Sequence, residues 1–166
     1  MVASDGLVRL EPNRGAWVTR VTVAEVEEVF PVLAALEALA GQLACDRITG
    51  DEIAAIRALH QDMQACFDAR DLDGYFRLNQ NIHAAIVASA RNPTLSASCQ
   101  ALSLRVLRAR FLANMSEDRW RDAMVEHEEI LRLIEVRDGA ALGDLLARHL
   151  LAKQDAVLRW LKTGGA

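Results

Sequence analysis

The chain has 166 residues, of which 52% are hydrophobic and 25% are charged, which predicts one domain with a substantial core. Its formal net charge of −4 and the lack of a dense Lys/Arg run argue against a nucleic-acid-binding surface. No apolar run approaches the roughly 20 residues that cross a bilayer, and no signal-peptide pattern opens the chain. The three widely spaced cysteines are typical of reduced core residues. We therefore expect a cytoplasmic protein without membrane contact.

Residues 4–20 contain two short apolar runs separated by a turn rich in Pro, Asn and Gly. Apolar and charged residues alternate over 8–11, and Trp17 and Val18 follow the turn, which predicts a small β-hairpin. An isolated two-stranded hairpin is marginally stable in water. The segment is therefore either a loose arm or the remnant of another domain.

From Thr22 onward every segment has the apolar periodicity of a helix. Thr22 with Glu25, and Thr49 with Glu52, have the spacing of a capping box and mark two helix starts. The later helices begin at residues that cap well: Asp71, Asn92, Ser116 and Asp138. The predicted helices span about 22–46, 50–69, 72–90, 93–114, 117–137 and 139–162.

Short connections between these helices favour antiparallel packing of neighbours. Pro31 lies inside the first helix and is expected to kink it or split it in two. The sequence thus predicts an all-α protein, an antiparallel bundle of six or seven helices with a short N-terminal hairpin.

Polar residues on apolar helix faces give the functional signal. Asn79 and His83 lie one turn apart on the apolar face of the third helix, and His127 and His149 lie on the apolar faces of two later helices. A buried imidazole is kept neutral, and the neutral ring binds zinc, nickel, manganese or iron. These residues predict a metal site, although each histidine could instead be a hydrogen-bonded core residue, which is how we interpret His60.

Enzyme motifs are incomplete or missing. His127-Glu128 begins like a zinc-protease motif, but position 131 is Leu where that motif needs a second His. The sequence has no Glu-x-x-His pair, no Gly-rich phosphate loop and no G-x-S-x-G elbow. Glu126, Glu128 and Glu129 are typical of a solvated face, with one or two of these carboxylates near the site. We therefore do not predict an enzyme.

The spacing of these residues is similar to that of a known family. Asn79-x-x-x-His83 is followed by Asn92-Pro93-x-Leu95, then Glu126-His127 and Asp138, and finally His149-Leu150. From Gly6 to Leu161 the chain resembles the effector-binding domain of GntR-type bacterial transcription regulators, the FadR C-terminal (FCD) class. The hairpin sequence GLVRLEPNRGAWV resembles the wing and exit of a winged helix-turn-helix domain.

The resemblance implies a domain organisation and partners. Residues 1–21 would be a remnant of the wing and linker, and residues 22–163 a helical effector-binding and dimerisation domain. A homodimer is expected, with the first and fourth helices at its interface. DNA would be bound only through an N-terminal domain missing from this chain.

The resemblance also implies a ligand site. Asn79, His83, His127 and His149 would hold a divalent metal, zinc first, with nickel or manganese as alternatives, and the metal would coordinate a small carboxylate effector. The predicted function is ligand sensing and dimerisation in a GntR-family transcriptional regulator. Two alternatives are a mononuclear metal-dependent enzyme of hydrolase type, in which the metal activates water, and a metal-free structural dimerisation module.

Two positions depart from the family pattern. Asn79 stands where relatives carry Asp, and a neutral ligand should weaken metal binding while strengthening attraction for an anion. Leu33 stands where many relatives carry an effector-binding Arg. Arg105 and Arg108 on the fourth helix are candidate replacements, unless they are ordinary surface charges.

Overall fold

The structure is a computed structural model that describes residues 8–11, 15–18, 21–114 and 116–163. These residues form a hairpin followed by seven helices, which confirms the predicted all-α bundle. The elements are β1 (Val8–Glu11), β2 (Gly15–Val18), α1 (Val23–Arg47), α2 (Gly50–Asp68), α3 (Leu72–Ser89), α4 (Pro93–Arg105), α5 (Leu107–Ala113), α6 (Glu117–Glu135) and α7 (Gly139–Lys162). The strands β1 and β2 are antiparallel, with Val8 opposite Val18, as the hairpin prediction requires.

Local capping explains where the helices begin. Thr49 and Glu52 form a complete capping box at the start of α2, in which each side chain bonds the other residue's backbone. The remaining predicted caps each accept a hydrogen bond from a backbone N–H three residues on: Thr22, Asp71, Asn92, Ser116 and Asp138. Helix starts were therefore predictable from short sequence patterns.

The prediction of one helix over 93–114 was wrong, because α4 and α5 are separate helices. The break lies at Val106, whose φ of −107° and ψ of 12° leave the helical region. No Pro or Gly marks this point, and Val106 is fully buried. Packing of Val106 therefore overrides local helix propensity. Pro31, by contrast, does not split α1, which is continuous from Val23 to Arg47.

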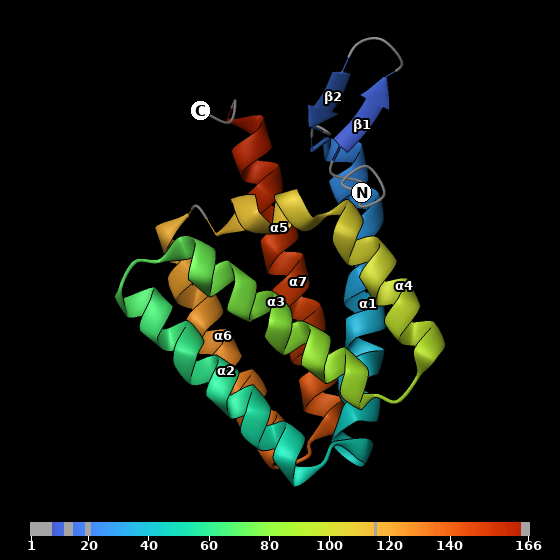
Figure 1. Cartoon of the computed structure of the whole chain (residues 1–166), viewed down its shortest axis with the longest axis vertical. Helices are drawn as coiled ribbons and strands as arrows, with labels where there is room; N and C mark the ends of the chain where they lie inside the picture. Colours follow the sequence, from blue (N-terminus) through green and yellow to red (C-terminus); the bar gives the residue numbers. More distant parts are fainter. Residues whose placement is uncertain (1–7, 12–14, 19–20, 115, 164–166) are drawn as a thin grey trace.

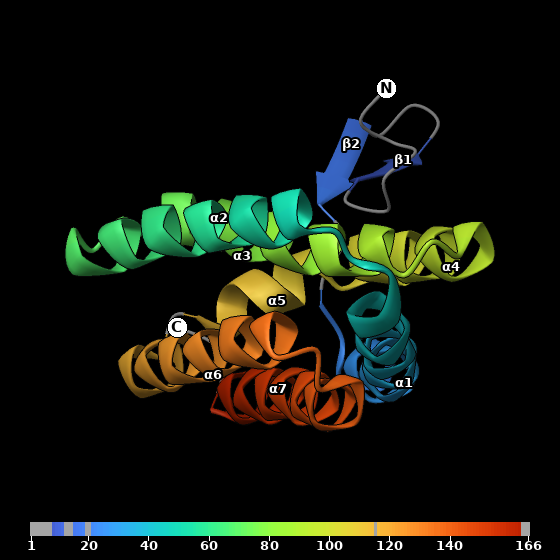
Figure 2. The ribbon, with the colours of Figure 1, turned by 90° about the horizontal axis from the view of Figure 1, so that it is seen from below.

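The helices form two layers. In Figure 2, α2, α3 and α4 lie in one layer, α1, α6 and α7 lie in the other, and α5 crosses between them. Figure 1 shows α1 and α7 running antiparallel along most of their lengths. Two glycines bring these helices close: a Cβ on Gly41 would lie 2.6 Å from Leu146 Cδ1, and one on Gly143 would lie 3.0 Å from the Ala38 carbonyl oxygen.

Helix α1 is a core helix. It is the one described helix that is long and apolar enough to cross a membrane, judged by length and composition only. However, 50% of its most apolar stretch is buried inside the fold. Its buried side includes Phe30, Leu33 and the carboxylate of Glu37. This side packs against α3, α4 and α7, and it places one ionisable group in the interior of the bundle.

Candidate metal centre

Three histidines from three helices meet in the interior. His83 of α3, His127 of α6 and His149 of α7 each offer one ring nitrogen, and these nitrogens lie within 4.8 Å of one another. The ring centroids are 4.9 to 5.3 Å apart, and no ring is more than 3% exposed. The structure thus brings together the three histidines that the sequence analysis selected.

Two carboxylates, the buried Glu37 and the partly exposed Glu126, orient two of these rings. Glu37 Oε2 lies 2.5 Å from His83 Nδ1, and Glu126 Oε2 lies 2.5 Å from His149 Nδ1. Because an ionised carboxylate only accepts, each ring carries its proton on Nδ1 and donates it. The Nε2 lone pairs of His83 and His149 then stay free, and within the described part of the chain neither atom has a hydrogen-bond partner. Histidines that bind metals are typically oriented in this way.

The electrostatics favour neutral rings beside an ionised Glu37. Burial holds the pKa of His127 and of His149 well below the usual value, and it also lowers the pKa of His83. Burial alone would raise the pKa of Glu37, but His83, Arg110 and Lys153 together lower it to about 2. Neutral imidazole is the form that a divalent metal binds.

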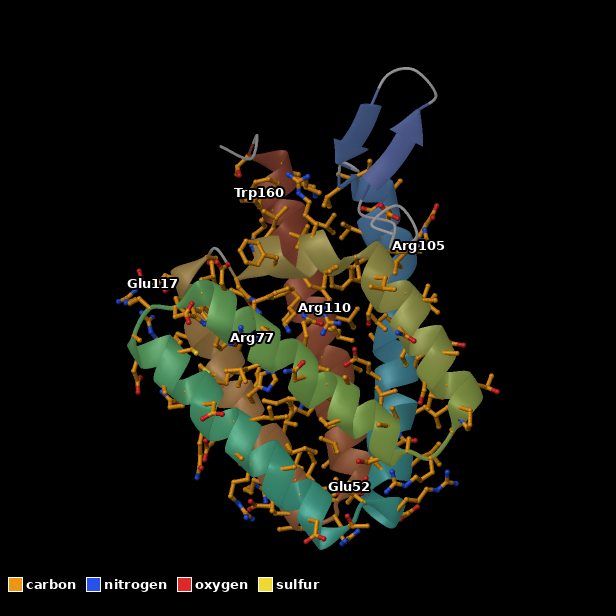
Figure 3. The ribbon with its side chains drawn as sticks, in the orientation of Figure 1. Glu52, Arg77, Arg105, Arg110, Glu117 and Trp160 are labelled. Carbon is orange, nitrogen blue, oxygen red and sulfur yellow. The ribbon has the colours of Figure 1, made fainter. Side chains whose placement is uncertain are left out.

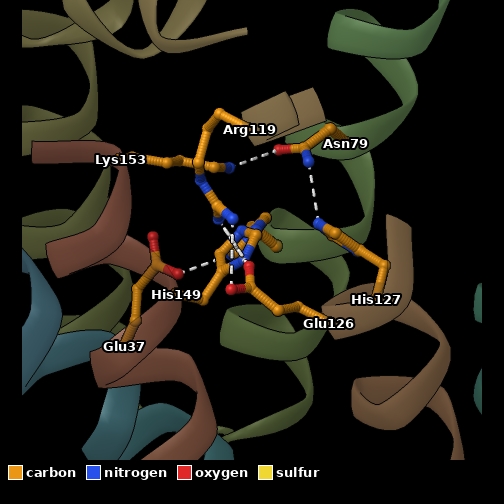
Figure 4. A network of polar contacts seen from close by, with 8 residues as sticks. Glu37, Asn79, Arg119, Glu126, His127, His149 and Lys153 are labelled. Atoms are coloured by element: carbon orange, nitrogen blue, oxygen red, sulfur yellow. Dashed lines mark hydrogen bonds and ion pairs between the residues drawn. The ribbon is translucent and has the colours of Figure 1, made fainter. Parts of the chain in front are cut away.

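Asn79 lies beside the cluster, between two polar side chains (Figure 4). Its Nδ2 lies 2.7 Å from His127 Nε2, and its Oδ1 accepts a hydrogen bond of 3.1 Å from Lys153 Nζ. The amide oxygen, the atom that would bind a metal, is therefore engaged by Lys153. A metal that takes Asn79 as its fourth ligand must displace this hydrogen bond.

Lys153 is a further polar residue at the centre. It lies one turn after His149 on α7 and is 1% exposed. Burial, with Arg110 and Arg119 nearby, holds its pKa well below the usual value. No carboxylate of the described residues lies within salt-bridge distance of Lys153, and a charged Lys153 would oppose a second cation here.

Glu126 is fixed by Arg119, two turns earlier on α6. Arg119 Nη1 donates to Glu126 Oε1 at 3.1 Å, and Nη2 donates to Oε2. Arg119 is 6% exposed, and the Glu126 side chain is 25% exposed. This two-pronged contact holds the carboxylate against His149. His60 is outside the cluster and lies 3.5 Å from Glu128, in keeping with a structural role.

A cavity of about 390 Å³ adjoins the histidine cluster. Its walls come from α1, α3, α4 and α5, and His83, Glu37 and Arg110 lie among the lining residues. Arg105 and Arg108 are not among them: both are exposed, and Arg105 pairs with Glu25 at 3.4 Å. Figure 3 shows Arg105 at the outside of the bundle and Arg110 in its interior.

The sequence analysis missed four polar residues at the site, each of which interrupts or extends an apolar stripe. They are Glu37, Arg110, Arg119 and Lys153. Glu37 stands in an apolar stretch of α1, and Lys153 follows His149 by four residues. The apolar neighbours of Glu37 and the four-residue spacing of Lys153 from His149 are visible in the sequence, and they place both residues on buried helix faces.

Comparison with known proteins identifies the family. The sequence matches the FCD domain family over residues 28–152. The chain belongs to the FCD domain family, which confirms the resemblance noted in the sequence.

The relatives are named as transcription regulators. The chain is 22% identical over 156 residues to the HTH-type transcriptional repressor RspR of Escherichia coli K12, and the match covers 94% of this chain and 68% of RspR. An HTH-type regulator of Agrobacterium vitis is 33% identical over 89 residues, which cover 52% of each chain. Both relatives are named as HTH-type regulators of transcription.

Solved structures share the fold. Escherichia coli McbR/YncC superposes with a TM-score of 0.84 at 17% identity, covering 95% of this chain and 80% of that one. A putative GntR regulator from Rhodococcus sp. RHA1 gives a TM-score of 0.79 at 18% identity, with 95% of this chain and 75% of that one covered. The helical arrangement is therefore that of GntR-type regulators.

Proposed function

We propose that this domain senses a small carboxylate through a divalent metal ion held by His83, His127 and His149. The observation that carries the proposal is the convergence of three buried ring nitrogens within 4.8 Å. Two of the rings are oriented by carboxylates, as metal-binding histidines commonly are. Three nitrogen ligands with an open fourth position suit zinc, and nickel or manganese would also accept them.

The cavity beside His83 supplies room for the effector. A bound metal would contribute a positive charge and an open coordination position for a carboxylate oxygen. The protein contributes the walls and the orientation of the ligand. Because residues of α1, α3, α6 and α7 meet at this centre, occupancy would alter the packing of four helices.

Such a change in packing suits a regulator. In a dimeric cytoplasmic regulator, shifts between the helices would reset the spacing of two DNA-binding heads carried by the N-terminal domains. The coupling would be reciprocal, so that operator DNA and effector would change each other's affinity by the same factor. Dimer formation and DNA binding belong to this proposal.

The test is a titration of zinc into chelator-treated protein, followed by calorimetry. The wild type should bind one zinc ion per chain, and His127→Ala or His149→Ala should abolish binding while helical content stays near native. His60→Ala is the matched control, since His60 is buried but outside the cluster. Equal zinc binding in the wild type and in both cluster variants would refute the site.

Lys153 favours one alternative, a metal-free dimerisation module. Its hydrogen bond to Asn79 places the Lys153 amino group next to the histidines, and this group, once protonated, could take the place of a metal ion. In that case the wild type would take up no zinc in the same titration. The enzyme alternative has no comparable support, because the relatives regulate transcription.

A further inference from the structure

Arg110 is a buried arginine whose hydrogen bonds are incomplete. It is 1% exposed, and its Nη1 donates to Ser103 Oγ at 3.3 Å and lies 3.8 Å from Glu37 Oε1. Its Nε and Nη2 have no hydrogen-bond partner among the residues that the structure describes. Burying donors without partners costs about 1–3 kcal/mol each, so native proteins rarely leave them so.

The two unpartnered atoms form one edge of the guanidinium group. Nε–H and one Nη2–H are parallel donors, and their spacing matches the two oxygens of a carboxylate. Ser103 and Glu37 occupy the Nη1 end and fix the group. The free edge is therefore a rigid two-donor site, and Arg110 lines the cavity beside the histidines.

We propose that Arg110 anchors the carboxylate of the effector through its Nε and Nη2 edge. This inference rests on the proposed function, and it adds the residue that sets the ligand class. His83 and Arg110 line the same cavity, so one carboxylate group at this end can face both the guanidinium and a metal on the histidines.

The rest of the cavity sets the body of the ligand. Its walls combine apolar side chains with uncharged polar ones: Ala84, Val87, Leu104 and Leu107 with Gln80, Asn81, Ser96 and Gln100. Arg110 is the only Arg or Lys among the lining residues, so a second carboxylate would have no cationic partner there. The ligand class is thus a small monocarboxylic acid with an uncharged body.

The experiment uses three acids, hexanoate, benzoate and lactate, and their uncharged amides. Binding is followed by the ¹H–¹⁵Nε signal of Arg110, which is assigned by its loss in Arg110→Lys, and by calorimetry. At least one acid should shift this signal at millimolar concentration, and its amide should not. If no acid shifts the signal, or if amides bind as well as acids, the proposal is overturned.

Variants separate Arg110 from other arginines. Arg110→Lys and Arg110→Gln should weaken binding of the acid by about tenfold or more, whereas Arg105→Gln and Arg108→Gln should change it by less than about threefold. Unchanged affinity in the Arg110 variants, or a loss that follows Arg105 or Arg108, would overturn the assignment. Ala84→Phe adds a bulky ring to the exposed part of the cavity wall and keeps Arg110, so it should also weaken binding. If the Arg110 variants do not fold, retained binding in Ala84→Phe rejects the site.

Zinc uptake, measured in the same variants, distinguishes this inference from the proposed function. Arg110→Lys should retain zinc, because Arg110 is not a metal ligand. Acid binding that survives removal of zinc but is lost in Arg110→Gln would support the anchor and reject the metal-dependent mechanism. If the protein takes up zinc and Arg110→Gln leaves acid binding unaffected, the metal site is supported and the Arg110 anchor is rejected.

Discussion

At the residue scale, the pair of Asn79 and Lys153 governs how strongly the centre attracts a cation. Asn79 contributes no formal charge, and its oxygen already accepts a hydrogen bond from Lys153. Removing a positive group, or adding a negative one, should strengthen metal binding by simple Coulomb attraction. A divalent metal at this centre should therefore be held more weakly than at a site with Asp at position 79.

Asn79→Asp should bind zinc more tightly, by more than about threefold, and a carboxylate more weakly. An Asp at this position adds a negative charge next to the cation and reduces the attraction for an incoming anion. The gain in zinc affinity should be larger in a Lys153→Met background, where no ammonium competes for the carboxylate. Calorimetry with zinc and then with an acid measures both effects. A change below about threefold, or about 0.7 kcal/mol, in both affinities would show that Asn79 is not a ligand.

The buried histidines predict how stability depends on pH. The folded-state pKa of His127 and of His149 is well below the ordinary value of 6.5, so the unfolded chain binds more protons as pH falls below that value. The slope of unfolding free energy with pH is then positive, and stability is lost on acidification. Glu37 adds to the loss below its ordinary pKa of 4.5, because its folded-state pKa is lower.

Urea unfolding of zinc-free protein at pH 7.5 and at pH 5.5 checks this prediction. The free energy of unfolding should be smaller at the lower pH. His149→Gln, which cannot take up a proton, should show a weaker dependence than the wild type. Equal or greater stability of the wild type at pH 5.5 would contradict the neutral state assigned to these rings.

At the element scale, local signals and long-range packing differ in how well the sequence reveals them. Each capping residue acts within one turn, so the starts of the helices could be read directly. The break at Val106 depends on burial against other helices and could not. The break changes the directions in which Arg105, Arg108 and Arg110 project from the helix. The sequence therefore could not show which of the three arginines is buried.

Three helices end at arginines in the left-handed region: Arg70, Arg91 and Arg137 have φ of 59°, 50° and 57°. This conformation costs a residue with a side chain roughly 1–2 kcal/mol, and glycine much less. Arg70 makes an exposed ion pair with Glu117, which contributes little. Arg137 donates to the carbonyls of Cys45 and Ile48 at the end of α1.

Glycine at these two ends should therefore have different effects. Arg70→Gly should leave the free energy of unfolding unchanged or raise it, since strain is removed and little is lost. Arg137→Gly should be less stable than Arg70→Gly by about 1–2 kcal/mol, because two hydrogen bonds disappear. Chemical denaturation of the two variants measures the difference. Equal stabilities would show that the Arg137 side chain does not hold α1 in place.

At the scale of the whole molecule, α1 carries apolar side chains that the described residues leave exposed. Val32 is 51% exposed and Leu39 is 43% exposed, and a spacing of seven residues places them on the same side of the helix. Two DNA-binding heads need a fixed separation, so a second copy of the chain is the expected partner for this surface.

Val32→Glu combined with Leu39→Glu should convert a dimer into a monomer, because charges would be buried at the interface. Light scattering at tens of micromolar measures the change in mass. Val125→Glu is the matched control, since Val125 is 69% exposed on α6, away from α1, and it should leave the dimer intact. A monomeric wild type, or a dimer that survives the double substitution, would contradict this interface.

The histidines of the centre were predictable because each lies on the apolar face of its own helix. Their partners were harder to predict. The sequence places Glu37 and Lys153 on buried faces, but their contacts with His83 and Asn79 depend on the packing of α1 and α7 against α3. Pairwise distances between helices are a property of the assembled molecule. Sequence periodicity shows which side of a helix is buried, but not which residues of another helix it meets.

X-ray absorption at the zinc edge tests the central claim most directly. For zinc-loaded wild type we predict three imidazole nitrogens at about 2.0 Å, with the remaining position filled by oxygen. His149→Ala should lose one imidazole or the metal itself. A sulfur shell near about 2.3 Å, which would implicate cysteine, or a zinc ion with fewer than two imidazoles, would contradict a metal centre built from His83, His127 and His149.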